Sequence, residues 1–278
     1  MAVAGVAVLA ACSGGSDDTA QTTRPDRSST TTTPAASSSS TTSVPTGGAA
    51  APEATSTTTA ARAGAPSQRG ATKPTTSPPD GIATATTTPP GRYRYASTGT
   101  FSAGVTGEQR RSGESILTVD PPAGADQHSL RQGDNRSSEQ ILRFQPDGTY
   151  IVMLKITDQG LTKEFRPATP VLAFPYSAPV GRTWSWRMTS TDGKTTVETS
   201  FRIERTEAVP VGSQSVPAVV VQATVVTTGD LTSRGTQTLW VAESRRLVVR
   251  EQSATEGTFG AFSFRSTAEE RLLQLDPS

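Results

Sequence analysis

The aromatic residues of this chain are confined to one part of the sequence, and this limits which part can fold around a core. All fifteen lie between Tyr93 and Phe264 of the 278 residues. A stretch without large apolar side chains cannot offset the entropy of ordering its backbone. The sequence therefore predicts one folded domain over residues 91–278, long enough to bury roughly 70% of the surface of its unfolded chain.

The segment from residue 12 to residue 90 is predicted to be a disordered linker. It consists mainly of Thr, Ser, Ala, Pro and Gly, and the runs Thr30 to Thr33 and Ser37 to Thr42 are nearly homopolymeric. Its prolines favour extended conformations, so it suits a spacer that carries the domain away from an anchor. A tract rich in Thr, Ser and Pro is also a candidate for O-linked glycosylation.

Cys12 is the only cysteine and follows a short apolar run from Ala2 to Ala11. That run is about half the length needed to cross a bilayer as a helix, so it is typical of a signal peptide. The residues Leu9-Ala10-Ala11-Cys12 resemble the lipobox of bacterial lipoproteins. The alternative is an ordinary thiol. No Lys or Arg precedes the apolar run, so we expect a mis-assigned start codon.

The lipobox resemblance implies a cellular location for the protein. Residues 1–11 would be removed as a signal peptide, and Cys12 would carry a diacylglycerol. Two acyl chains give durable membrane anchoring. The expected localisation is extracytoplasmic, on the outer leaflet of the cell membrane. The excess of arginine over lysine, 22 to 4, indicates a GC-rich genome such as those of actinobacteria.

The charge balance gives no reason to expect a nucleic-acid partner. The formal net charge is +1, so no strong field attracts a polyanion. Arginine and tyrosine alternate from Arg92 to Tyr95, as in single-strand binders. On a strand, however, the arginines would take one face and the tyrosines the other. We expect this segment to be a first strand with its tyrosines inward.

The clearest hairpin runs from Arg182 to Arg205. Trp184, Trp186 and Met188 alternate with polar residues, and the turn contains the Asp192-Gly193 pair that tight hairpins favour. The returning strand alternates in the same way, with one face formed by Val197, Thr199, Phe201 and Ile203. This pattern predicts a half-buried sheet.

A second hairpin is predicted from Gln140 to Ile156, with its turn at Pro146-Asp147-Gly148. Its second strand is apolar on both faces up to Leu154, which favours a central strand. No stretch has a helical period. Eight to eleven short strands predict an all-β fold, with a single antiparallel curled sheet forming a half-barrel, barrel or sandwich. The further expected strands are 92–101, 114–120, 218–227, 236–242, 247–252 and 259–273.

Two local patterns resemble a family of uncharacterised β-rich bacterial envelope proteins. One is Phe174-Pro175-Tyr176 followed by Val180 to Trp186; the other is Leu239 to Ala242 followed, after a charged turn, by Leu247 to Glu251. The family usually has glycine where this chain has Arg246. The resemblance implies a curled antiparallel sheet and no catalytic residues.

The sequence offers little for catalysis or metal binding, and we expect neither an enzyme nor a cofactor. His128 is the only histidine and has no nucleophile motif near it, so we expect a surface residue in a loop or at a strand end. One histidine and one lipidated cysteine cannot supply the ligands of a zinc site.

Paired carboxylates could still act as they do in glycosidases, if two of them share a cleft. Most of the candidate glutamates alternate with arginines and are expected to form a solvated charge ladder. Glu269 and Glu270 are consecutive and should point to opposite faces. The candidates are Glu198, Glu204, Glu207, Glu243, Glu251, Glu256, Glu269 and Glu270.

We therefore expect a membrane-anchored, non-catalytic β domain that binds or scaffolds a cell-wall or envelope protein partner. The alternative is a carrier of lipid or another apolar ligand in a curled-sheet cavity. The candidate lining residues, which could equally be ordinary core, are Tyr150, Trp184, Trp186, Met188, Phe201 and Trp240.

Overall fold

The computed structural model describes residues 86–104, 107–134, 136–158 and 160–278. The predicted signal peptide, Cys12 and the linker as far as residue 85 lie outside the described residues, so those expectations stay predictions. No helix in the described part of the chain is long and apolar enough to span a membrane.

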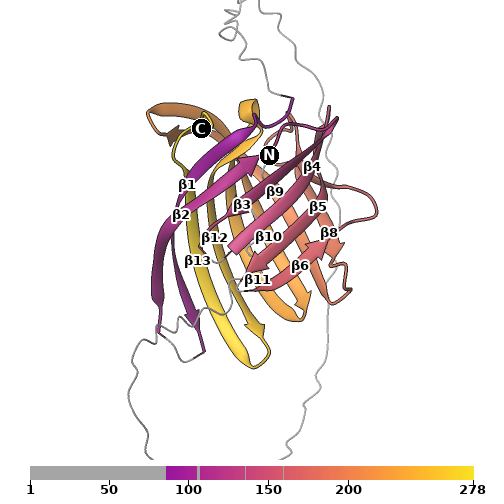
Figure 1. Ribbon diagram of the computed structural model, residues 1–278, viewed down its shortest axis with the longest axis vertical. Coiled ribbons are helices and arrows are strands. Elements are labelled where there is room, and N and C mark those ends of the chain that lie inside the picture. The colour runs from indigo at the N-terminus through magenta and orange to yellow at the C-terminus, as the bar shows by residue number, and fades with distance from the viewer. Residues whose placement is uncertain (1–85, 105–106, 135, 159) are drawn as a thin grey trace, which may run out of the picture. The chain divides into compact units, whose positions relative to one another are not determined.

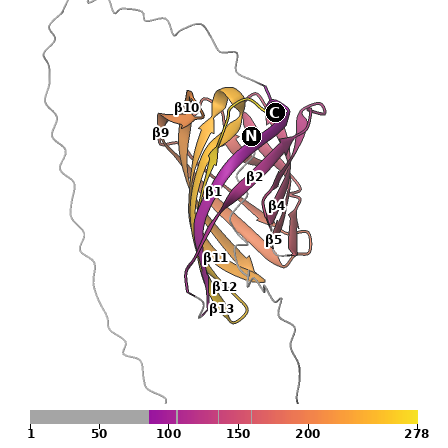
Figure 2. The ribbon, with the colours of Figure 1, turned by 60° about the vertical axis from the view of Figure 1, so that its left-hand side comes forward.

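The described chain forms one antiparallel sheet (Figures 1 and 2), which confirms the predicted fold class. Its thirteen strands exceed the eight to eleven that the sequence predicts. They are β1 (Gly91–Ala103), β2 (Gln109–Val119), β3 (Asp126–Gln132), β4 (Arg136–Gln145), β5 (Gly148–Asp158), β6 (Leu161–Phe165), β7 (Val171–Pro175), β8 (Thr183–Thr189), β9 (Thr195–Val211), β10 (Gln214–Gly229), β11 (Leu231–Ala242), β12 (Leu247–Phe259) and β13 (Phe262–Leu272). A short 3-10 helix, η1 (Glu243–Arg245), connects β11 to β12.

The sheet curls until its two ends almost meet. The strand order runs β6-β5-β4-β3-β2-β1-β13-β12-β11-β10-β9-β8, and β7 pairs with β5 beside this path. At the seam between β6 and β8, Phe165 forms a single bridge with Ser190, and the Thr191 N–H donates to the Glu164 carbonyl at 2.7 Å. Of the three predicted forms, the sheet is therefore closest to a barrel.

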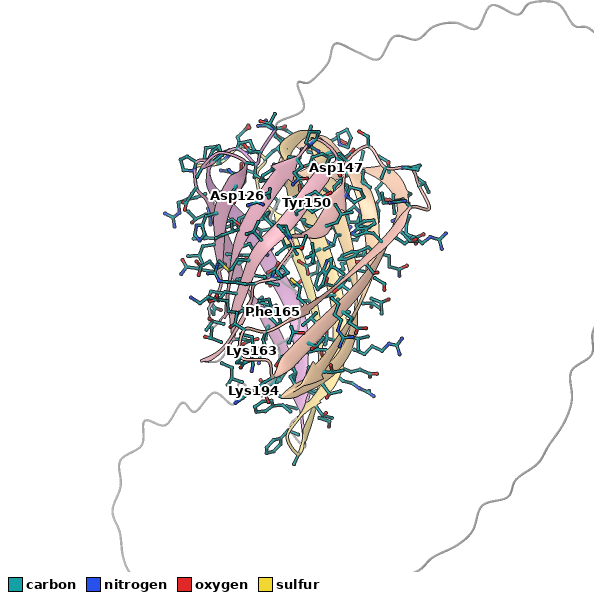
Figure 3. The ribbon with its side chains drawn as sticks, turned by 90° about the vertical axis from the view of Figure 1, so that its right-hand side faces the viewer. Asp126, Asp147, Tyr150, Lys163, Phe165 and Lys194 are labelled. Carbon is teal, nitrogen blue, oxygen red and sulfur yellow. The ribbon has the colours of Figure 1, made fainter. Side chains whose placement is uncertain are left out.

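A lysine strengthens this seam. The Lys163 Nζ lies 2.8 Å from a carboxylate oxygen of Asp192 and 2.8 Å from one of Asp230. These aspartates belong to the β8–β9 and β10–β11 turns, so one side chain joins β6 to two hairpins. Figure 3 shows Lys163 and Phe165 on this side of the sheet.

The predicted hairpin from Arg182 to Arg205 is confirmed as β8 and β9. Trp186 and Met188 are buried while Arg187 between them is exposed, and the alternation continues along β9. Gly193 in the turn has a φ of 72°, a conformation that favours glycine.

The predicted hairpin from Gln140 to Ile156 is confirmed as β4 and β5. β5 pairs with β4 on one side and with β6 and β7 on the other, so it is central, as expected. β3, β6 and β7 were not predicted. β3 has polar side chains at its buried positions, Gln127, Ser129 and Arg131, so it lacks the apolar alternation that marks a strand.

One expectation about this region was wrong. His128 lies inside β3, not in a loop or at a strand end, because β3 pairs with β2 and β4 through polar side chains. Its ring is on the face opposite Arg131, where Nδ1 lies 2.7 Å from Asp120 and Nε2 lies 3.2 Å from Glu139.

The core has two parts. The larger lies on the inner face of the curl and includes Phe101, Ile156, Phe165, Phe201 and Phe264. The smaller lies toward the end where the described chain begins and includes Tyr93, Val220, Trp240 and Leu247. Register shifts at Val220/Val221 and at Trp240/Val241 accompany burial of consecutive residues, so β10 and β11 are covered on both faces there.

The two ends of the described domain are hydrogen-bonded to each other. The Arg92 N–H donates to the Ser278 carbonyl at 3.2 Å, and the Ser278 N–H donates to the Arg92 carbonyl at 3.1 Å. Both ends therefore lie at the same end of the sheet, as Figure 1 shows.

Arg246 occupies the position where the resemblance leads one to expect glycine, and its backbone explains that preference. Its φ is 51°, in the left-handed region that side chains other than glycine rarely adopt. The guanidinium lies 3.3 Å from the centroid of the Tyr176 ring, and the carbonyl accepts a hydrogen bond from the Thr88 hydroxyl. These contacts offset the local strain.

Candidate functional site

Four of the six predicted lining residues come together on the inner faces of β8 and β9. The Trp184 and Phe201 rings stack at 4.9 Å with an interplanar angle of 7°, and Trp186 approaches Phe201 at 6.0 Å. Met188 belongs to the same core cluster. We call Trp184, Trp186, Met188 and Phe201 the aromatic wall. Only Trp184 among them is not fully buried.

Four polar atoms beside the aromatic wall have no hydrogen-bond partner among the described residues. They belong to Trp184 (Nε1), Trp186 (Nε1), Thr199 (Oγ1) and Gln237 (Nε2), which we call the donor strip. Thr199 lies directly opposite Trp186. Ala223 on β10 pairs with Phe201 on one side and with Gln237 on the other, so Phe201 and Gln237 lie in the same row across the sheet. Such buried atoms are rare, and each costs about 1–3 kcal/mol if left unsatisfied.

The other two predicted lining residues do not join this group. The Tyr150 hydroxyl donates to Asp147 at 2.7 Å near the protein surface, and this bond raises the pKa of Tyr150. Figure 3 shows Tyr150 and Asp147 toward the end of the sheet away from Lys163. Trp240 belongs to the smaller core, where its indole N–H donates to Glu207.

A second inner region is ionic. Arg131 on β3 lies 2.8 Å from Glu270 on β13, its Nε donates to the Ser115 hydroxyl at 3.2 Å, and its guanidinium lies 3.9 Å from the centroid of the Tyr95 ring. Glu251 on β12 is directly opposite Glu270 and is only 6% exposed. We call Tyr95, Arg131, Glu251 and Glu270 the charged wall.

The two glutamates of the charged wall have different surroundings. Burial raises the pKa of Glu251 to about 8, the neighbouring Glu270 adds to this rise, and Arg131 opposes it. Near neutral pH Glu251 is therefore mostly protonated, whereas Glu270 forms the ion pair with Arg131. The pair is chemically an acid beside a carboxylate, but its charge is already compensated inside the sheet.

Sequence reasoning missed the charged wall because it places Arg and Glu in solvent by residue type. Simple alternation along β12 could not have found it. Glu251 lies opposite Leu239 and Leu247 lies opposite Ala242, so the register shift at Trp240/Val241 places Leu247 and Glu251 on different faces.

The expected charge ladder is confirmed on the outer face. Glu198 pairs with Arg187 at 2.8 Å, and Glu269 pairs with both Arg250 and Arg271. Glu269 and Glu270 point to opposite faces, as predicted, since Glu270 meets Arg131 inside. Glu251 and Glu270 are the exceptions, since both lie on the inner face.

A cavity of about 620 Å³ lies where β1 and β10 to β13 come together at the end of the sheet that contains the β10–β11 and β12–β13 turns. Its lining includes Thr232, Arg234, Glu256, Thr258, Ser263 and Arg265, all of them exposed. None of the six predicted lining residues belongs to it. Within the described ranges, no group of His, Cys, Asp and Glu side chains could hold a metal ion.

Comparisons with known proteins identify no family. No protein-family model matches the chain, and no curated protein matches it. Among solved structures, the hypothetical lipoprotein YmcC from Escherichia coli is 15% identical, with a TM-score of 0.31, over 62% of this chain and 85% of that one.

Two other solved structures are similar at the same level. A protein described as exported, with a YmcC-like fold, from Bacteroides fragilis is 10% identical, with a TM-score of 0.31, over 69% of this chain and 98% of that one. A DUF1329 family protein from Desulfovibrio piger is 8% identical, with a TM-score of 0.21, over 65% and 84%. At these TM-scores none of the three structures indicates the family or the function of this chain.

Proposed function

We propose that the described domain is a non-catalytic binding module of the cell envelope, held outside the membrane by a diacylglycerol on Cys12. Its ligand is an amphiphilic molecule that lies against the inner faces of β8 to β11. The donor strip beside the aromatic wall is the observation that carries this proposal.

The chemistry of this region suits such a ligand. Trp186, Met188 and Phe201 offer an apolar surface for a hydrocarbon or ring system. The indole N–H groups and the Gln237 amide are donors, so a carboxylate or ester carbonyl on the same molecule would satisfy them. Binding sites are typically apolar, with a few converging polar groups that fix orientation.

The seam gives this region a route to solvent. β8 pairs with β9 along its length, but its links to β6 are confined to the end near Ser190, where the Phe165–Ser190 bridge and the Thr191–Glu164 hydrogen bond lie. Trp184, near the start of β8, is partly exposed. A molecule entering between β7 and β8 would meet Trp184 first and would have to displace its edge-on contact with Phe174 of β7, whose ring centroid lies 6.3 Å away.

The absence of a catalytic role is part of the proposal. Glu251 and Glu270 face each other, but one is buried and protonated and the other is paired with Arg131. His128 is held between Asp120 and Glu139 on the other face of β3. Neither arrangement offers an uncommitted acid and base to a substrate.

Native mass spectrometry of the full chain with Cys12→Ala, purified from the medium of the native host, tests the ligand. We expect a bound small amphiphile in a 1:1 complex. Gln237→Met, which removes an inner donor at similar volume, should lose it, whereas Gln222→Met on the exposed face of β10 should keep it. Protein without any bound species, or binding that Gln237→Met leaves intact, would contradict the proposal.

Fractionation tests the anchor separately. Cys12→Ala, or treatment with globomycin, should shift the protein from the membrane fraction to the medium. Unchanged membrane retention would refute lipidation at Cys12 without bearing on the inner site.

A further inference from the structure

The cavity at the turn end of β10 to β13 presents charges and hydroxyls in two regular rows. Across β11, β12 and β13 the first row is Arg234, Glu256 and Arg265, each directly opposite the next. Two residues away on the same strands, the second row is Thr232, Thr258 and Ser263. Because side chains two apart share a face, these six groups point the same way, spaced about 5 Å across strands and about 7 Å along them.

The charges of this array are not balanced. The Arg265 Nε lies 3.6 Å from a Glu256 carboxylate oxygen, a loose pair in which the two side chains are 81% and 66% exposed. Arg234 makes no ion pair with any residue the structure describes. By contrast, Arg187 in the same cross-strand row has a carboxylate partner, Glu198, at 2.8 Å. The cavity therefore has a guanidinium available for an anionic group.

We propose that this cavity binds an acidic saccharide, a polyhydroxylated ring that carries a carboxylate. Arg234 pairs with the carboxylate of the sugar in a bidentate contact. Thr232, Thr258, Ser263 and Glu256 exchange hydrogen bonds with its hydroxyls. The volume of about 620 Å³ is within the usual range for a small-molecule site.

This site is independent of the amphiphile proposed inside the sheet. Its residues lie on the outward positions of β11 to β13, whereas the donor strip occupies inward positions of β8, β9 and β11. Gln237→Met should leave saccharide binding unchanged, so the two proposals can fail separately.

Isothermal titration of the full-length protein in a polyoxyethylene detergent tests the site with three acidic probes: oligogalacturonate, hyaluronate oligosaccharides and soluble muropeptides. At least one should bind, and a neutral dextran oligosaccharide of similar length should bind at least about ten-fold more weakly, since it lacks the charge-assisted contact. Absence of binding by all three acidic probes, or equal binding by dextran, overturns the proposal.

Variants then locate the binding. Arg234→Ala should weaken it about ten-fold or more. Arg187→Ala is the matched control, because Arg187 is an exposed arginine in the same cross-strand row but outside the cavity. A loss in Arg187→Ala equal to that in Arg234→Ala would mean non-specific charge attraction and would overturn the site.

Inorganic phosphate separates a saccharide site from a simple anion site. Phosphate should compete only weakly, because it uses Arg234 but gains little from the hydroxyl row. Competition by phosphate at concentrations equal to those of the best oligosaccharide would overturn the saccharide assignment.

Discussion

The aromatic wall and the charged wall are inner surfaces of the same sheet, yet they are built from opposite chemistry. The aromatic wall buries Trp186, Met188 and Phe201. The charged wall buries Arg131 and Glu251, with Glu270 close by. Both obey the two-residue alternation of a strand. Alternation along a strand therefore determines which face a side chain takes. The residues that it meets across the inside of the sheet determine whether an apolar or a charged side chain is stable there.

The largest loss of stability should come from a substitution in the aromatic wall. Phe201→Ala removes a ring that is 4% exposed and contacts both Trp184 and Trp186. We expect the free energy of unfolding in urea to fall by about 3–5 kcal/mol. Ser200→Ala, on the exposed face of the same strand, should change it by less than about 0.5 kcal/mol. A loss below about 1 kcal/mol for Phe201→Ala would show that this wall is loosely packed.

Breaking the charged wall should cost somewhat less. Arg131→Met leaves Glu270 without its counter-charge in a largely buried site, so we expect a loss of about 3 kcal/mol in the free energy of unfolding. Adding Glu270→Gln should recover part of it. Arg94→Met, at an exposed pair with Glu114, should cost less than about 1 kcal/mol. Equal losses for Arg131→Met and Arg94→Met would contradict a buried ion pair.

The charged wall should also make stability depend on pH, unlike the aromatic wall. The pKa of Glu251 is about 8 in the folded protein and near 4.5 when unfolded, so the folded state holds its proton more tightly. Its contribution is fully present below pH 4.5 and is lost as pH rises toward 8, with a slope of at most about 1.4 kcal/mol per unit. Chemical denaturation across this range should show the slope, and Glu251→Gln should reduce it. Identical pH profiles would disprove the assignment.

The smallest loss of stability should come from a substitution at the seam between β6 and β8, beside the aromatic wall. Lys163→Met removes the link to Asp192 and Asp230, whose carboxylates are partly exposed, so we expect a loss of about 1 kcal/mol. Because Lys163 holds the pKa of Asp192 well below its usual range, acid should loosen the same contact. Hydrogen exchange of the Thr191 amide should quicken, while amides of β1 stay protected. Unchanged exchange at Thr191 would mean that the bridge alone holds the seam.

The strands that sequence predicted best are those with strong local signals. β8 and β9 combine alternating Trp, Met and Phe with an Asp-Gly turn, so their register follows from the chain itself. β7 is a short segment that ends at Pro175, and β3 is polar on its buried face, so neither carries such a signal.

The candidate sites depended on contacts between distant segments, and sequence could place only part of them. The donor strip needed the register of β8 to β11, which sets Gln237 in the row of Phe201. The ion pair of Arg131 and Glu270 joins residues that are far apart in the chain. The saccharide cavity needed five strands in register, although Arg234, Glu256 and Arg265 taken singly look like an ordinary solvated face.

The mutual hydrogen bonds of Arg92 and Ser278 mean that the polypeptide of this domain nearly forms a ring. A few added residues could join those ends, and the ring could be cut instead between Gly260 and Ala261, at the exposed tip of the β12–β13 hairpin. Such a circular permutant would keep every strand pairing. It would move the attachment point of the linker to the opposite end of the sheet. It would reverse the domain relative to the proposed anchor, so that the orientation of the domain could be varied without changing its composition.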